Sequence, residues 1–356
     1  MKFLKLIALV VSVVVFTGCT NNKNNISDDS IDIVTSFYPI YSIAQEITKN
    51  SSNVNLINMT TPSTGCLHDY QLTSGDMKKL SGADLFIING GDMESFISNI
   101  EKSLPNLQII DTSIGTHMLE SAGHTHSHYE EHEDHNHEEC EILEHEHEDH
   151  SHEECEILEH THDEHTHEHI EETEIASHIH NEDDGHDHGS TNAHIWLSPE
   201  NAAIQAENIC NALCSIDSVN SNIYTENLKS FKSKVNQLIN ETSDINFEGK
   251  SAAVFHEGYS YFADWFGFDI LAEIYMDENT DPSPQLLANT IDTVNKNNIE
   301  VLLCADDASL KIAETVANET NAKIYVIDPL TYGNENNETY TDIMKRNTYI
   351  IKEAFQ

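Results

Sequence analysis

Residues 251–266, SAAVFHEGYSYFADWF, carry the pattern that decides the fold, a short apolar strand followed directly by a helix. Small and apolar residues fill 251–255, as is typical of a buried strand. Residues 258–266 have the composition of a short helix. His256 lies between the two, at the carboxyl end of the strand, where open α/β sheets bind their ligands. We therefore treat this β–α unit as the part of the chain that positions a functional side chain.

The same alternation of strand and helix recurs along most of the chain. Apolar runs typical of strands occur at 31–36, 54–59, 85–88, 108–111, 270–275, 301–304 and 323–327. Helical patterns occur at 39–47, 73–80, 93–100, 283–297, 308–319 and 339–354. Such alternation predicts an α/β fold with mostly parallel sheets and helices on both faces.

A longer helix is predicted at 222–242, between the two groups of strands. Its apolar residues form one stripe, namely Tyr224, Leu228, Phe231, Val235 and Leu238. A helix of this length extends roughly 30 Å. It would join two lobes as a stiff connection. The pattern is equally compatible with an ordinary surface helix of one lobe.

Residues 124–188 differ from the rest in composition. They hold all but four of the chain's 23 histidines, with 25 acidic residues and no Lys or Arg. The sequence HEDHNHEECEILEH at 132–145 recurs at 147–160 with one change. Such a segment has too few apolar residues to fold by itself. We interpret it as an inserted loop that gathers divalent metal through imidazole and carboxylate groups. The alternative is a solvated charged segment that binds metal adventitiously.

The first residues have the features of an export signal. Lys2 and Lys5 precede an apolar run over 6–16 that is too short to be a comfortable membrane span. Cys19 follows in the sequence FTGC, which resembles the lipidation motif of bacterial lipoproteins, with Phe16 where Leu is usual. We therefore expect a lipid anchor at Cys19. A secretory signal with an incidental cysteine is the alternative.

The four histidines outside 124–188 can be considered one by one as metal ligands. His68 and His256 follow predicted strands, and His194 comes shortly before a predicted helix start at Ser198. Each alone could be a structural residue, but three neutral imidazoles and one oxygen make a tetrahedral site suited to Zn²⁺. Together, beside a metal-binding segment, they predict a metal site. We treat the fourth, His117, as part of a linker.

The motif HIWLSP at 194–199 resembles the HIWLDP motif of the lipoproteins that deliver Zn²⁺ or Mn²⁺ to ABC importers. Further segments resemble that family in the same order, namely TGCLHDYQLTSGD at 64–76, FHEGYSYF at 255–262, DPSP at 281–284 and IDPL at 327–330. The resemblance covers nearly all of 31–356. It implies an α/β fold of two lobes, each with a mostly parallel sheet flanked by helices, joined by a long rigid helix, with metal between the lobes.

The resemblance also implies the organisation of the chain. We expect a lipoprotein signal over 1–19, a polar tether over 20–30, an N-terminal lobe over 31–219 containing the metal-gathering loop 124–188, a linker helix over 220–243 and a C-terminal lobe over 244–356.

Carried over by position, the resemblance implies that His68, His194 and His256 are the imidazole ligands. Manganese-binding members tend to have Glu where His256 stands, and imidazole suits Zn²⁺ better than carboxylate-preferring Mn²⁺. We therefore predict Zn²⁺, with Mn²⁺ as the second choice. The fourth ligand stays open between Asp328 and an oxygen from water or from 124–188. A thiolate ligand at Cys66, two residues before His68, is a further alternative.

We expect an extracytoplasmic zinc receptor, not an enzyme. It would be a monomer anchored by lipid, and it would deliver Zn²⁺ to an ABC transporter permease with its ATPase. The net charge of −45 argues against binding of nucleic acid or anionic lipid surfaces. Two other classes remain open. One is a metal storage protein that uses 124–188, and the other is a metallohydrolase with Glu257 as the candidate base.

Overall fold

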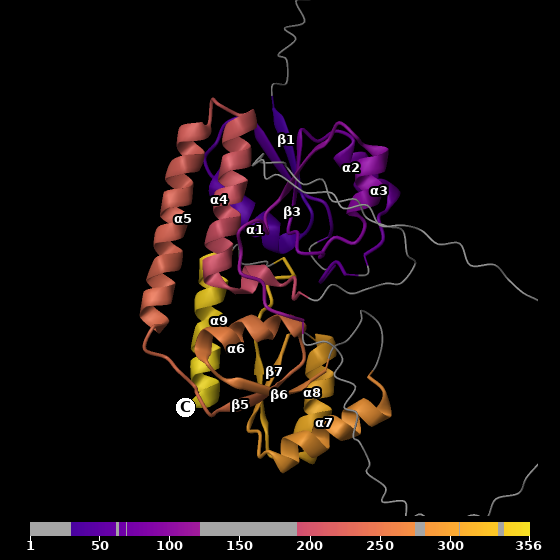
Figure 1. Ribbon diagram of the computed structural model, residues 1–356, viewed down its shortest axis with the longest axis vertical. Helices are drawn as coiled ribbons and strands as arrows, with labels where there is room; N and C mark the ends of the chain where they lie inside the picture. The colour runs from indigo at the N-terminus through magenta and orange to yellow at the C-terminus, as the bar shows by residue number, and fades with distance from the viewer. Residues whose placement is uncertain are drawn as a thin grey trace, which may run out of the picture. The chain divides into compact units, whose positions relative to one another are not determined.

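The computed structural model describes residues 30–61, 64–68, 70–121, 191–274, 282–305, 307–333 and 338–356. The predicted export signal, the lipidation of Cys19 and the segment 124–188 lie outside these residues. The described residues on both sides of 124–188 belong to one compact unit (Figure 1). No helix in the described part of the chain is both long enough and apolar enough to cross a bilayer.

The first sheet is built from the N-terminal part of the chain. Its four parallel strands lie in the order β2-β1-β3-β4. They are β1 (Ile31–Thr35), β2 (Val54–Asn58), β3 (Leu85–Ile88) and β4 (Gln108–Asp111). The helices that connect them are α1 (Tyr38–Thr48), α2 (Ser74–Leu80) and α3 (Ile97–Ser103). Each parallel pair is therefore reached by a helical crossover, as parallel strands require.

The second sheet repeats this arrangement in the C-terminal part. Its four parallel strands lie in the order β6-β5-β7-β8. They are β5 (Ser251–Val254), β6 (Asp269–Glu273), β7 (Val301–Cys304) and β8 (Lys323–Val326). The helices of this part are α6 (Ser260–Phe266), α7 (Pro284–Lys296), α8 (Asp307–Glu319) and α9 (Tyr340–Phe355). The α/β fold with two parallel sheets flanked by helices is thus confirmed.

Strands β3 and β7, one inner strand from each sheet, show why apolar runs predict these sheets. All four residues of each strand are buried. Parallel strands covered by helices on both faces carry continuous apolar runs, in contrast to the alternating pattern of a half-exposed strand.

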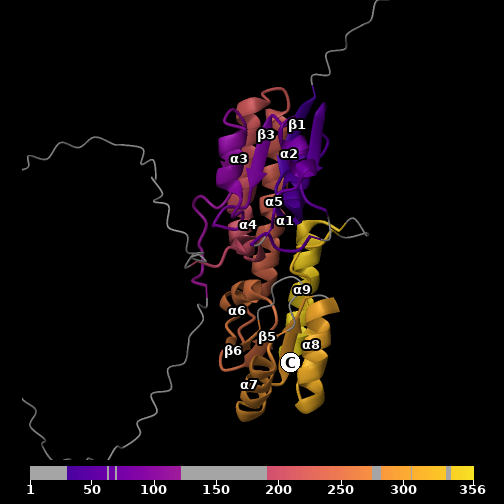
Figure 2. The same ribbon diagram turned by 90° about the vertical axis from the view of Figure 1, so that its right-hand side faces the viewer.

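Two long helices, α4 (Pro199–Ile216) and α5 (Ser221–Thr242), pack against each other (Figures 1 and 2). Helix α5 also contacts α1 of the first sheet and α9 of the second. The predicted apolar stripe is buried at Tyr224, Phe231, Val235 and Leu238. Because α5 packs on helices of both sheets, it is more than a surface helix of one lobe.

The seam between the sheets is packed and hydrogen-bonded. Trp196 is fully buried in the short 3-10 turn η1 (Ile195–Leu197), and one apolar core continues from the first sheet to the second. The indole of Trp196 donates to the carbonyl of Pro329 at 2.8 Å. The hydroxyl of Tyr340, at the start of α9, donates to the carbonyl of Trp196 at 2.7 Å. A smaller apolar cluster lies between the second sheet and helices α7 and α8.

The helix predicted at 93–100 begins later than expected, at Ile97. Residues 90–92 all have positive φ angles of 62° to 79°, so the chain turns here instead of entering a helix. The carboxylate of Glu94 accepts hydrogen bonds from the backbone amides of Asn89 and Gly90, at 2.8 and 3.0 Å. A side chain that satisfies these amides stabilises the turn, and composition alone did not reveal it.

Candidate metal centre

His194 lies at the centre of the site, immediately before η1. Its side chain is 2% exposed. Its Nδ1 lies 2.9 Å from Oδ1 of Asn192, whose Nδ2 donates to the carbonyl of Glu257. Because Oδ1 can only accept, Nδ1 of His194 carries the proton, and Nε2 keeps its lone pair. Asn192 therefore holds this ring in the tautomer that presents Nε2 to a metal.

His256 follows strand β5 and caps the 3-10 turn η2 (Glu257–Tyr259). Its Nδ1 accepts a hydrogen bond from the amide of Gly258 at 3.1 Å. Gly258 packs directly on the other histidine, because a Cβ at this position would lie 2.9 Å from the Cβ of His194 and 2.6 Å from Leu197. The absence of a side chain at 258 is what lets the two imidazoles approach, with ring centroids 4.8 Å apart.

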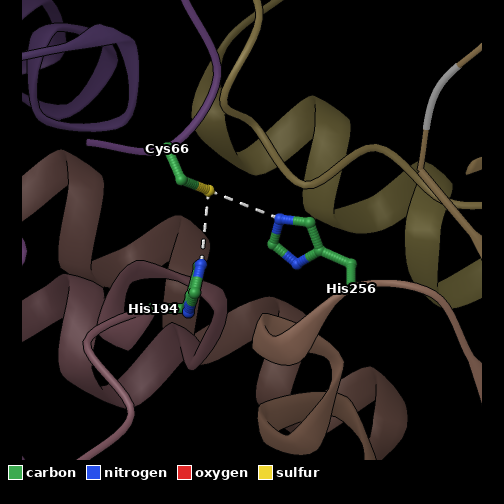
Figure 3. Close-up of side chains that lie close together, drawn as sticks. All are labelled: Cys66, His194 and His256. Atoms are coloured by element: carbon green, nitrogen blue, oxygen red, sulfur yellow. Dashed lines mark hydrogen bonds between the residues drawn. The ribbon is translucent and has the colours of Figure 1, made fainter. Parts of the chain in front are cut away.

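The third histidine comes from the loop between β2 and α2. His68 is half-buried, and its ring centroid lies 5.1 Å from that of His194. The same loop carries Cys66, whose Sγ lies 3.3 Å from Nε2 of His194 and 3.5 Å from Nε2 of His256. Figure 3 shows the sulfur facing both rings. The loop thus brings a thiol and an imidazole close to His194.

In the described part of the chain, two overlapping groups of side chains could hold a metal ion. The first is Cys66, His194 and His256, and the second is His68, His194 and Glu257. Within each group, the possible ligand atoms lie within 4.8 Å of one another. All three predicted histidines therefore lie in one cluster, and His194 belongs to both groups.

Asp328, the predicted fourth ligand, is in neither group of described residues. Its Oδ2 accepts from the guanidinium of Arg346 at 2.9 Å, and its Oδ1 accepts from the amide of Leu330 at 2.8 Å. Burial raises the pKa of this carboxyl above its usual value. Its oxygens are therefore engaged with these partners, and the structure does not bring Asp328 into the cluster.

The sequence offers little sign that Cys66 and Glu257 belong to the cluster. For Cys66, its spacing of two residues from His68 is the only signal in the sequence for a role as a ligand. Glu257 was considered only as a base, although it directly follows His256. It accepts from the hydroxyl of Ser121, and its Oε2 lies 3.9 Å from Nδ1 of His194. Glu257 thus lies on the Nδ1 side of His194, away from the thiol.

The electrostatics of the site favour a neutral donor set. Burial lowers the pKa of His194 well below its usual value of about 6.5, and repulsion from the neighbouring His256 and His68 lowers it further. A neutral imidazole is the form that binds metal. Nitrogen and sulfur donors are those that Zn²⁺ prefers, whereas Mn²⁺ prefers oxygen. This arrangement can hold a borderline divalent cation.

A buried polar network fixes the backbone beside His194. The side-chain amide of Asn89 donates to the carbonyl of Ala193 at 2.9 Å, and the side-chain amide of Gln205, on α4, donates to Oδ1 of Asn89 at 3.0 Å. Glu94 holds the backbone of the same turn, and burial raises the pKa of its carboxyl to about 7. The site is therefore attached to the end of β3 by groups that have no access to solvent.

We predict that His194 makes the stability of the metal-free protein depend on pH. Its pKa is lower in the folded than in the unfolded state, so only the unfolded state gains this proton as the pH falls below about 6.5. The free energy of unfolding should then fall by at most about 1.4 kcal/mol per pH unit from this group. Urea unfolding between pH 7.5 and 5, with a chelator present, measures this free energy of unfolding.

The matched comparison uses His194→Gln and, as control, His117→Gln, because His117 is exposed. The raised pKa of Glu94 acts in the opposite direction, so the quantity to compare is the difference in slope between variant and parent. His194→Gln should remove part of the fall in the free energy of unfolding at acidic pH, and His117→Gln should not. Equal slopes in all three proteins would contradict the prediction.

Comparisons with known proteins identify the family of this chain. The family model described as zinc-uptake complex component A, periplasmic (ZnuA), matches residues 33–354. The high-affinity zinc uptake system protein ZnuA of Bacillus subtilis is 26% identical over 99% of this chain and 98% of its own length. The zinc-binding protein AdcA of Streptococcus pyogenes is 25% identical over 99% of this chain, which spans only 61% of that relative.

A solved structure supports the fold. A zinc-bound variant of AdcAII from Streptococcus pneumoniae matches with a TM-score of 0.64 and 20% identity, covering 92% of this chain and 99% of that one. Since the family model covers most of the sequence, from the first strand to the last helix, the chain belongs to the family of the periplasmic zinc-uptake component ZnuA.

Proposed function

We propose that this protein is an extracytoplasmic receptor that binds Zn²⁺ and delivers it to the permease of an ABC importer. The observation that carries the proposal is that His68 and His256, from two other parts of the chain, lie beside the buried imidazole of His194. The relatives named for zinc uptake support the choice of cargo. The family consists of binding proteins, so the metallohydrolase alternative is set aside.

The donor set supports zinc over manganese. The cluster offers imidazole nitrogens from His68, His194 and His256 and a sulfur from Cys66, with one carboxylate at Glu257. Manganese sites are usually rich in carboxylate and water ligands. We therefore propose His68, His194 and His256 as the imidazole ligands of Zn²⁺. The engaged carboxylate of Asp328 makes it the weaker candidate for the fourth position.

The packing at the seam supports a receptor that moves little on binding metal. Helix α5 contacts helices of both sheets, and Trp196 is hydrogen-bonded to Pro329 and Tyr340 of the C-terminal part. Opening the lobes widely would expose this apolar core and break these bonds. We propose that Zn²⁺ favours a slightly more closed form, by an amount set by its difference in affinity for the two forms. The closed form would be the one that the permease recognises.

The proposal extends to the membrane anchor, the lobes and the oligomeric state. We propose a lipid anchor at Cys19, a tether over 20–30, lobes over 31–219 and 244–356, and a monomer that docks on the permease and its ATPase. The lipoprotein AdcA of Streptococcus pneumoniae, 23% identical over 99% of this chain, supports the anchored form. The division into lobes is a proposal about motion, because the described residues form one compact unit.

We propose that 124–188 gathers zinc for this site. The described residues nearest to the segment belong to the surroundings of the metal cluster. Ser121 donates to Glu257, Glu120 pairs with Thr191, and Asn192 orients His194. A chain of weak ligands attached at this point would raise the local metal concentration.

The first test of the receptor is competitive titration with Zn²⁺ and Mn²⁺ against chelators, on a protein that lacks 124–188. The bridge between Glu120 and Thr191 keeps the ends together, so residues 121–123 and 189–190 can close the loop. We expect one tight site that prefers Zn²⁺. His194→Ala should weaken it by more than about 100-fold, since it removes a ligand and not merely an outer partner. His117→Ala is the control and should change nothing.

If removal of 124–188 abolishes nearly all of the zinc capacity, the protein is a storage protein instead. A single tight site that prefers Mn²⁺, or one unaffected by His194→Ala, would contradict the choice of cargo or of ligand.

A second prediction concerns the role of 124–188 in cells. Deletion of the segment should slow growth under severe zinc limitation and have no effect when zinc is plentiful, because only capture of scarce metal needs it. Growth of the deletion strain at a series of chelator concentrations measures this. Unchanged growth at every concentration would refute the gathering role while leaving the receptor intact.

A third prediction concerns Asn192. Asn192→Ala removes the acceptor that holds Nδ1 of His194, so zinc affinity should fall by about 10–100-fold, as is usual for the outer partner of a metal-binding histidine. Asn208→Ala is the matched control, because the side-chain amide of Asn208, like that of Asn192, donates to backbone carbonyls, here those of Thr112 and Ile114 outside the cluster. Equal zinc affinities in the two variants would refute this role of Asn192.

A further inference from the structure

We infer that Cys66 is itself a zinc ligand and that its sulfur, not the carboxylate of Asp328, completes the donor set around His194. This inference rests on the proposed function, since it adds a donor to the same site. The thiol belongs to a cluster and does not stand alone. Its Sγ lies 3.3 Å from Nε2 of His194 and 3.5 Å from Nε2 of His256, and the side chain of His194 is almost completely buried.

These two distances are close to those of a tetrahedral zinc site. Zn–S bonds of about 2.3 Å and Zn–N bonds of about 2.0–2.1 Å at tetrahedral angles place sulfur and nitrogen about 3.6 Å apart. The separations of 3.3 and 3.5 Å therefore approach two edges of such a tetrahedron. Little movement of the 64–68 loop is needed to seat an ion between the three atoms.

The oxygen donors near the site are less well placed for this position. The oxygens of Asp328 accept from Arg346 and from the amide of Leu330. Glu257 accepts from Ser121 and approaches His194 on its Nδ1 side, which faces away from the sulfur. On the Nε2 side of His194, the described residues that form a metal-binding group with it are Cys66 and His256, which supply sulfur and nitrogen.

The protons at the site can be followed through the binding step. Nδ1 of His194 donates to Asn192, so its Nε2 accepts from the thiol of Cys66. When zinc binds, it replaces the thiol proton, which passes to solvent, and a Zn–S bond takes the place of the S–H bond. Nδ1 of His256 accepts from Gly258, so coordination through its Nε2 requires the ring proton to move to Nδ1 and this bond to be given up.

A thiolate ligand has a consequence for metal choice. Thiolate binds Zn²⁺ and other soft or borderline ions, whereas Mn²⁺ prefers carboxylate and water. Cys66 would therefore be a residue that determines specificity, in addition to raising affinity. Cys66→Ser should lower zinc affinity by at least about tenfold and manganese affinity by less. Cys66→Asp should shift the Zn²⁺-to-Mn²⁺ preference further toward Mn²⁺.

The decisive experiment uses Co²⁺ as a spectroscopic substitute for Zn²⁺. The full chain carries serine at Cys19, Cys140 and Cys155, so that the cysteines outside the described residues cannot contribute. One equivalent of Co²⁺ should give the near-ultraviolet absorption of a thiolate-to-cobalt charge transfer. Cys66→Ser should abolish it. Cys214→Ser, a half-buried cysteine on α4, is the matched control and should keep it.

The outcomes separate this inference from the receptor itself. Absence of the band in the parent, or its persistence in Cys66→Ser, overturns sulfur ligation, and so does a zinc affinity that Cys66→Ser leaves unchanged. In those cases the loss of tight zinc binding in His194→Ala would still support the receptor. A parent without a tight zinc site would overturn both. A folded Cys66→Ser protein, shown by an unchanged circular dichroism spectrum, excludes loss of structure as the cause.

Discussion

The segment from Asn192 to Leu197 holds the two halves of the protein together and also forms the centre of the site. Trp196 fills the seam between the sheets, donates to Pro329 and accepts from Tyr340. Two residues earlier, His194 is held by Asn192. Because one short turn does both tasks, the orientation of the central imidazole depends on the packing of the seam. A change in the relative position of the lobes must change the geometry around His194.

Burial explains how this site can hold a metal and remain part of the core. An unpaired polar group in an apolar surrounding is costly, so the imidazole is kept neutral and its Nδ1 is bonded. A neutral buried imidazole is also a metal ligand that needs no deprotonation. Desolvation therefore lowers the proton affinity of His194 and makes it ready for a cation. The same low-polarity surroundings strengthen the hydrogen bonds of Asn89, Gln205 and Glu94 that fix the adjacent backbone.

The arrangement also bears on how metal could be released. Helix α5 and the continuous core oppose large movements of the lobes. The loop that carries Cys66 and His68 is held in the core by Leu67, whereas Cys66 and His68 themselves are only half-buried. Small shifts of these two side chains would open the Nε2 side of His194 while Leu67 and the seam stay in place. A site built in this way can exchange a bound ion through a local change and keep the surrounding fold.

The amino-acid sequence by itself determined the fold and indicated which histidines to consider as ligands. Apolar runs such as that of β7, the apolar stripe of α5 and the position of His256 after β5 are local patterns, and local patterns follow from strand and helix periodicity. Only the tertiary structure decided which other side chains meet these histidines. Cys66 lies 128 residues from His194 and 190 from His256, and Asp328 is paired with Arg346 on a different element. Such contacts depend on how loops from separate elements fold back on one another. The spacing of two residues along the chain contains no information about the distance between their side chains in space.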